Sequence, residues 1–185
     1  MSTCPTSTFP CWAALCKAVL PFRSVAFTTE LATSSASSSW PVAMLLRTGK
    51  TPSGKEAAGH IRRLVRHLRR NWPDTHITIR GDGHYGRPEV MAYCDAARVD
   101  YVFGLPTNSA LRADPAIVAV ADACAVKRAQ RQCPVLRNYA ETRYGAKTWK
   151  CQRRVVARIE ASTLGMDIRY VVTSLATGSA EHIYD

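Results

Sequence analysis

Residues 76–105 constrain the fold more than any other part of the sequence, because they read as a strand, a helix and a second strand in a short span. Ile77 and Ile79 alternate with polar neighbours, and residues 99–105 (VDYVFGL) form a strand-like run. Between them, residues 88–98 open with proline and glutamate and carry apolar residues at helical spacing. A connection of this kind joins parallel strands by a right-handed crossover. The segment therefore predicts an α/β fold.

The first of these strands ends in a glycine-flanked acid, Asp82. A carboxylate at the carboxyl edge of a strand can hold a metal ion. Asp-Gly is also a common turn dipeptide, because aspartate tolerates the backbone geometry of turns. Taken alone, the motif favours the turn and leaves the metal site open.

Residues 56–72 predict an amphipathic helix. Its apolar stripe has the spacing i, i+3, i+4, i+7 and consists of Ile61, Leu64, Val65 and Leu68. The remaining surface carries five arginines, namely Arg62, Arg63, Arg66, Arg69 and Arg70. These arginines either form a solvated face or contact phosphates, and their mutual repulsion favours phosphate contact.

The last third of the chain predicts a helix followed by a hairpin. Asp114 and Pro115 supply a cap and a first turn for a helix to about residue 131. Alternation in residues 154–160 and 168–173 then predicts two antiparallel strands with one wet face. The basic residues of the region 127–154 include Lys147, Lys150, Arg153 and Arg154, with Tyr139, Tyr144 and Trp149 among them. Such a mixture suits a nucleic-acid surface, although aromatic residues in strands are more often core.

Composition narrows the class of partner. The 185 residues suit one domain, and 25 Lys plus Arg against 14 Asp plus Glu give a net charge of +11 and a pI near 9.7. This surplus favours nucleic acid first and an anionic membrane second, against the alternative of a merely basic soluble protein. The seven cysteines have no zinc-ligand spacing and predict reduced thiols in a cytoplasmic protein. No apolar run approaches the roughly 20 residues of a membrane span.

The first 39 residues differ from the rest. Eight of the twelve residues 28–39 are serine or threonine, which predicts a disordered or non-native leader. Residues 41–47 (PVAMLLR) then suit a buried strand, and a basic loop follows. That loop lacks a phosphate-binding pattern, because Glu56 stands where Ser or Thr is needed.

Several long stretches of the chain, in this order, resemble bacterial insertion-sequence transposases of the DDE type, with the group-one DDE domain and its RNase H-like fold. They are PVAMLLRTGKTPSGKE, HIRRLVRHLRRNWP, ITIRGDGHYGRPEVMAYC, VDYVFGLPTN and RYVVTSLATGSAEHIYD. The resemblance implies an internal fragment: an α/β, incomplete RNase H-like domain with a mixed sheet and flanking helices, plus a β-rich insertion. It places the partial core at residues 40–126 and the basic insertion at 127–185, truncated before the last catalytic helix.

The resemblance also implies a function. Members of the family cleave and transfer DNA strands with two Mg²⁺ or Mn²⁺ ions held by two aspartates and a glutamate, and Asp82 matches the second aspartate. No aspartate precedes Asp74, and the glutamate-bearing helix would follow residue 185. We therefore expect a truncated, inactive transposase in the bacterial cytoplasm, with transposon-end DNA and a second copy or an intact transposase as partners and no membrane. The alternative is a non-catalytic DNA-binding fragment that interferes with intact transposase.

Overall fold

The computed structural model describes residues 22–33, 36–48 and 52–185, in two units that divide after Lys50. In the first unit, β1 (Phe22–Thr33) and β2 (Ala36–Thr48) pair as an antiparallel hairpin. The strand predicted at 41–47 lies within β2. The predictions for residues 1–21 and for the loop at 49–51 fall outside the described residues.

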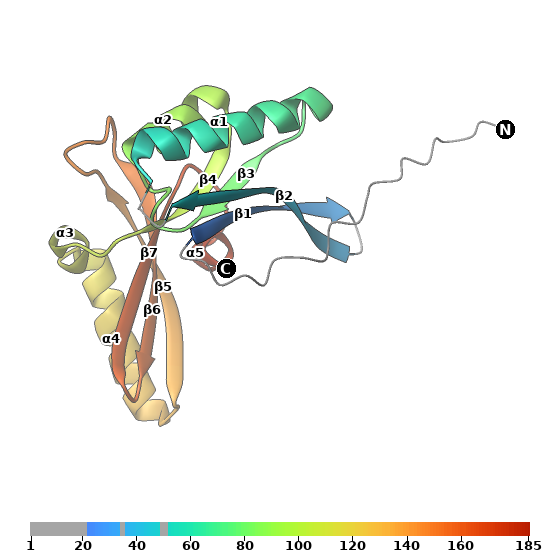
Figure 1. Ribbon diagram of the computed structural model, residues 1–185. Helices are drawn as coiled ribbons and strands as arrows, with labels where there is room; N and C mark the ends of the chain where they lie inside the picture. The colour runs from blue at the N-terminus through green and yellow to red at the C-terminus, as the bar shows by residue number, and fades with distance from the viewer. Residues whose placement is uncertain (1–21, 34–35, 49–51) are drawn as a thin grey trace. The chain divides into compact units, whose positions relative to one another are not determined.

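The second unit is built on a five-stranded mixed sheet in the order β3-β4-β7-β6-β5 (Figure 1). Its strands are β3 (Thr78–Gly81), β4 (Asp100–Leu105), β5 (Val135–Tyr144), β6 (Arg153–Ser162) and β7 (Gly165–Thr173). β3 and β4 are parallel, and every other pair is antiparallel. The predicted α/β fold with a mixed sheet and flanking helices is confirmed, as are the parallel pair and the hairpin of the last third.

Five helices flank this sheet. They are α1 (Gly54–Asn71), α2 (Pro88–Ala97), α3 (Ser109–Arg112), α4 (Pro115–Arg131) and α5 (Ala180–Tyr184). Asp114 caps α4 as predicted, because its carboxylate accepts from the backbone N–H groups of Ala116 and Ile117. None of the helices in the described part of the chain is long and apolar enough to span a bilayer.

The two faces of the sheet carry different helices. On β5, Thr142 donates to the carboxylate of Asp114 at the start of α4, whereas Tyr139 donates to the carboxylate of Asp185 just after α5. Because residues 139 and 142 differ by an odd number, their side chains point to opposite faces. α4 therefore covers one face, and α5 packs on the other, where Ile183 joins Val102 and Val156 in a buried cluster.

The sheet runs continuously from the parallel pair into the last third, because β7 pairs with β4. β5 has no strand signal in the sequence, since its residues are mostly polar and include Arg137, Asn138 and Glu141. On the α5 face of the sheet, a charged side chain of β5 forms a cross-strand ion pair, because Arg137 lies 3.1 Å from Glu160. Residue 126, the predicted end of the core, lies within α4, and the division of the chain at residues 39 and 126 stays a prediction.

Candidate functional site

Asp82 follows the last residue of β3 and begins the loop that leads to α2. Its Oδ1 accepts a hydrogen bond from the backbone N–H of His84 at 2.9 Å, and its carbonyl accepts from the N–H of Tyr85 at 3.0 Å. The turn interpretation is therefore correct for one carboxylate oxygen. Asp82 is exposed, and among the described residues Oδ2 makes no hydrogen bond, so it is open to a ligand.

The loop after Asp82 lies directly against the backbone of β4. A Cβ on Gly104 would be 2.8 Å from the backbone nitrogen of Gly83 and 3.1 Å from the carbonyl carbon of Asp82. From the other side, a Cβ on Gly86 would be 2.7 Å from the carbonyl oxygen of Gly104. Glycine at both positions permits this approach, which fixes the place of Asp82 at the edge of the sheet.

Arg80, two residues before Asp82, connects the same strand to α5. Its guanidinium donates to the carbonyl oxygen of Asp185 at 2.6 Å and to that of Ile183. These bonds satisfy carbonyls at the C-terminal end of a helix, where a cation is favourable. Because Tyr139 holds Asp185 from β5 at 2.9 Å, α5 is fastened to both edge strands of the sheet.

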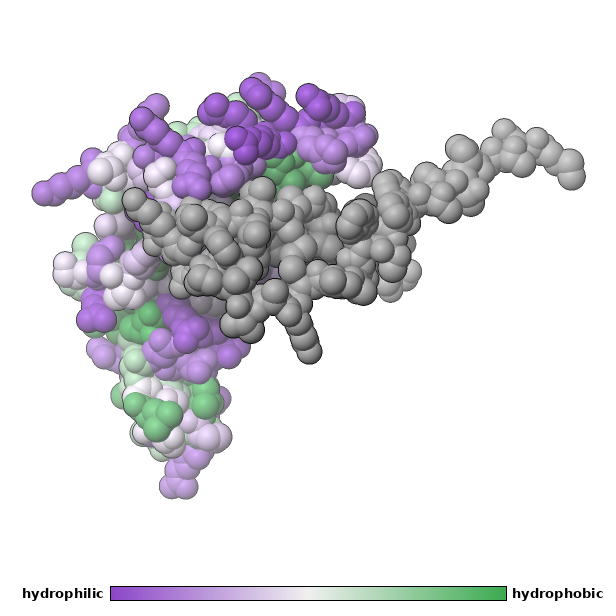
Figure 2. Space-filling model, viewed as in Figure 1, coloured by the Kyte–Doolittle hydropathy of each residue, from purple (hydrophilic) through white to green (hydrophobic). Residues whose placement is uncertain are grey.

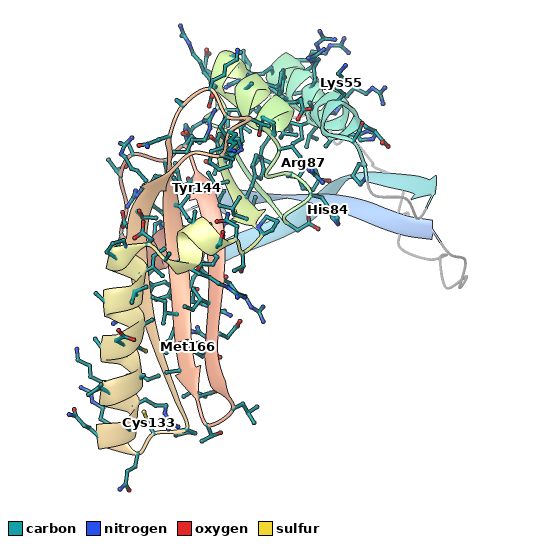
Figure 3. All side chains as sticks on the ribbon, turned by 90° about the vertical axis from the view of Figure 1, so that its left-hand side faces the viewer. Lys55, His84, Arg87, Cys133, Tyr144 and Met166 are labelled. Carbon is teal, nitrogen blue, oxygen red and sulfur yellow. The ribbon has the colours of Figure 1, made fainter. Side chains whose placement is uncertain are left out.

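The residues around Asp82 do not make a metal site by themselves. No group of three His, Cys, Asp or Glu side chains that could hold an ion occurs in the described residues. Mg²⁺ keeps most of its waters and needs several oxygen ligands in a fixed geometry. His84 and Arg87 lie on the same loop, and Lys55 lies along the same side of the unit (Figure 3). Lys55 and Arg87 are cations, whereas the carboxylate of Glu89 lies beside Gly54 at the start of α1, so this side of the unit carries charges of both signs.

The arginines of α1 fall into two groups. Arg69 turns back to donate to the carbonyl oxygens of Pro73, at 2.7 Å, and Thr75, and so fixes the segment after the helix. The other four are exposed, and no carboxylate of the described residues forms an ion pair with them; they are Arg62, Arg63, Arg66 and Arg70. Hydrophilic residues cover the outer surface of α1 and α2 (Figure 2).

One of these four, Arg62, lies against α2. Its guanidinium is 5.3 Å from the ring centre of Tyr93, a cation–π contact. Partial burial raises the pKa of Tyr93, and the charges of Arg62 and Arg66 oppose that rise. The contact orients the guanidinium of Arg62, and the residue remains exposed.

Arg153 and Arg154 are used within the fold. Arg153 binds both carboxylate oxygens of Asp95, at 3.1 and 2.6 Å, and the hydroxyl of Tyr101. Burial acts against the charge of Arg153, but the bonds to Asp95 raise its pKa overall. Arg154 pairs with Glu141 at 2.7 Å and donates to three carbonyls in the segment before α5.

The remaining predicted residues of this region lie in the loop between β5 and β6. Lys147 and Lys150 are exposed. The aromatic residues pack against one another, since the rings of Tyr144 and Trp149 are 5.4 Å apart in a T-shaped pair and Tyr139 lies 6.0 Å from Tyr184. DNA contact by Lys147 and Lys150 stays a prediction.

Two features of the site were missed by sequence reasoning. Arg80 reads as an ordinary polar residue of an alternating strand, and nothing in the local sequence indicates its bonds to the end of α5. The contact of Arg153 with Asp95 joins residues 58 apart, which no local pattern predicts.

Comparison with known proteins identifies a family. Residues 35–185 match the model of the family described as "Transposase DDE domain group 1". None of the curated proteins and none of the solved structures compared with the chain matches it. The match includes Asp82, the glycine-rich contact with β4 and all of the helices described above.

Proposed function

The chain belongs to the group 1 family of DDE transposase domains, and from this premise we propose that it binds DNA through α1 and does not cut DNA with Asp82 alone. The exposed arginines of α1 carry the proposal, since four cations that form no ion pair with described residues lie on one helix. In the family, divalent metal ions support DNA cleavage and strand transfer. We propose that this protein shares DNA binding with its relatives but does not share their DNA cleavage and strand transfer.

The geometry of α1 supports phosphate contact. Arg62 and Arg66, and likewise Arg66 and Arg70, are four residues apart, so their side chains are neighbours on the helix surface. Like charges at this spacing destabilise a helix by about 0.2 to 0.5 kcal/mol per pair. A phosphate backbone removes this repulsion and releases its own counterions, which makes the interaction favourable and salt-dependent.

Salt dependence of DNA binding tests this surface. We expect the variant with Arg63→Gln, Arg66→Gln and Arg70→Gln to bind a labelled duplex more weakly at every sequence tested. Its plot of log affinity against log salt should be less steep by about 0.9 for each phosphate that the variant no longer neutralises. The matched control replaces Arg112, Lys127 and Arg131, which are exposed on α3 and α4, by glutamine. Equal slopes for the two triple variants would contradict the proposal.

The chemistry is limited by the ligands. A two-metal mechanism needs both ions held near the reacting phosphate, and Asp82 is one carboxylate with one oxygen already bonded to His84. We propose that DNA incubated with the protein and Mg²⁺ or Mn²⁺ stays intact. A nick that appears with the native protein and disappears in Asp82→Ala would show that the proposal is wrong.

A second candidate function follows from the same pairing of an exposed basic helix with a single acid. A chain that binds DNA without cutting it can occupy sites that an intact transposase needs. Co-expression should then lower transposition by a complete element, and Asp82→Ala should lower it equally. The α1 triple variant should leave transposition at its normal level. If transposition is unchanged by the native chain, the protein is an inert member of the family.

A further inference from the structure

The edge of β7 is open over half of its length. β6 pairs with the whole of β7, but β4 pairs with residues 170–173. Within the described strands, residues 165–169 therefore have a neighbour on one side and none on the other. An open edge of this kind presents unpaired backbone N–H and C=O groups to any extended chain.

The side chains beside this edge are unusual for an unprotected strand. Leu164, in the turn before β7, is 98% exposed, and Met166 is 41% exposed. Met166 shares a face with the half-buried Ile168, while Asp167 and Arg169 lie on the other face. In Figure 3 this part of the sheet, marked by Met166, lies well away from the loop of His84 and Arg87.

We propose that residues 165–169 are a strand-addition site for a second copy of this chain, paired antiparallel about Asp167. In that register residue 165 of one copy faces 169 of the other, and Met166 faces Ile168. The added strand then fills the open edge of both copies and leaves the β4–β7 pairing of each undisturbed. A register shifted by two residues would place Met166 opposite Tyr170, whose edge Leu105 already occupies.

The chemistry of the two faces fits this register. On one face, the apolar Met166 and Ile168 of each copy cover each other, which removes exposed apolar area from water. On the other face the two Asp167 side chains meet. Each is already paired with Arg169 at 2.9 Å and lies 3.7 Å from Arg158, so more positive than negative charge surrounds the pair of carboxylates. The proposed contact is independent of α1 and of DNA.

Cross-linking tests the register in the full-length chain. The background carries serine at Cys4, Cys11, Cys16, Cys133 and Cys151, and keeps the buried Cys94 and Cys124. In this background, Asp167→Cys should form a covalent dimer on mild oxidation, because directly opposed Cβ atoms lie within about 5.5 Å. The matched control Arg169→Cys should not, because its counterpart is four residues removed along the partner strand.

Mass measurement tests the interaction without a cross-link. After nuclease treatment, the native protein should sediment as a dimer at roughly 100 µM, as expected for a small interface. Met166→Lys should sediment as a monomer, and the control Val126→Lys, at a residue 55% exposed on α4, should remain dimeric. A monomeric native protein that forms no cross-link at residue 167 would overturn the proposal. Equal cross-linking of Asp167→Cys and Arg169→Cys would also overturn it, because it would mean that the edges associate without a fixed register.

Discussion

Replacing Gly104 by alanine tests whether the backbone contact between β4 and the loop of Asp82 holds this site in place. The new Cβ would lie 2.8 Å from the nitrogen of Gly83, and an ordinary contact is about 3.5 Å, so the two segments must separate by roughly 0.7 Å. The atoms in the way are backbone atoms, which cannot turn aside as a side chain can. The loop is also held by the bond from His84 to Asp82.

We expect Gly104→Ala to lower the free energy of unfolding by about 1 to 3 kcal/mol, the usual cost of inserting a methyl group into a packed site. For a chain of this size each kcal/mol corresponds to about 2 to 4 °C in melting temperature. Urea unfolding followed by circular dichroism measures the free energy, and the amide NMR shifts of Gly83 and His84 report the displacement of the loop.

Gly59 provides the control, because a Cβ there would meet no atom within 4 Å. It lies inside α1, so Gly59→Ala should stabilise the protein by about 0.5 to 1 kcal/mol through helix propensity. The reasoning fails if Gly104→Ala has the same urea midpoint of unfolding as the native protein and the amide shifts of the loop are unchanged. It also fails if Gly59→Ala costs as much as Gly104→Ala.

Three further substitutions address the arginines and thiols. Arg153→Ala should lower the free energy of unfolding in urea by about 1 to 3 kcal/mol, because it leaves the buried Tyr101 hydroxyl without its partner. The folded variant should bind DNA with native affinity, and a lower affinity would mean that Arg153 contacts DNA. Burial raises the pKa of Cys94 from 9.0 to about 12, so its neutral thiol contributes stability that is complete below pH 9 and is lost as pH rises toward 12. Melting temperatures should therefore fall less steeply over this range in Cys94→Ala, and an identical slope would refute the assignment. Arg80→Ala should increase hydrogen exchange in α5 while α4 stays protected, and equal loss of protection in both helices would indicate global unfolding instead.

The parts of the fold that the sequence predicted are those with strong local signals. The stripe through Ile61 and Val65 is buried in α1, and Asp114 caps α4, since helical spacing and capping depend on a few neighbouring residues. β5 was missed because its polar residues are balanced by partners on β6, and cross-strand pairing cannot be read from one strand.

The candidate site shows the same limit. The position of Asp82 at a strand end followed from the alternation of Ile77 and Ile79 and from the flanking glycines. That Arg154 belongs to the fold did not follow, because its partners Glu141 and Gly178 lie 13 and 24 residues away. Charge alone could not separate an arginine at the surface from one bonded inside the sheet.

Because paired and unpaired arginines lie on different elements, the electric field of the second unit is asymmetric. Four arginines of the sheet, namely Arg137, Arg153, Arg154 and Arg158, each lie beside a carboxylate, so their fields largely cancel a short distance away. The exposed arginines of α1 have no such counter-charge among the described residues, and their field extends into solvent. A polyanion approaching at low salt therefore exerts a torque that turns α1 toward it before contact. Replacing α1 arginines should slow association more than it speeds dissociation, whereas replacing the arginines of the sheet should leave the encounter rate unchanged.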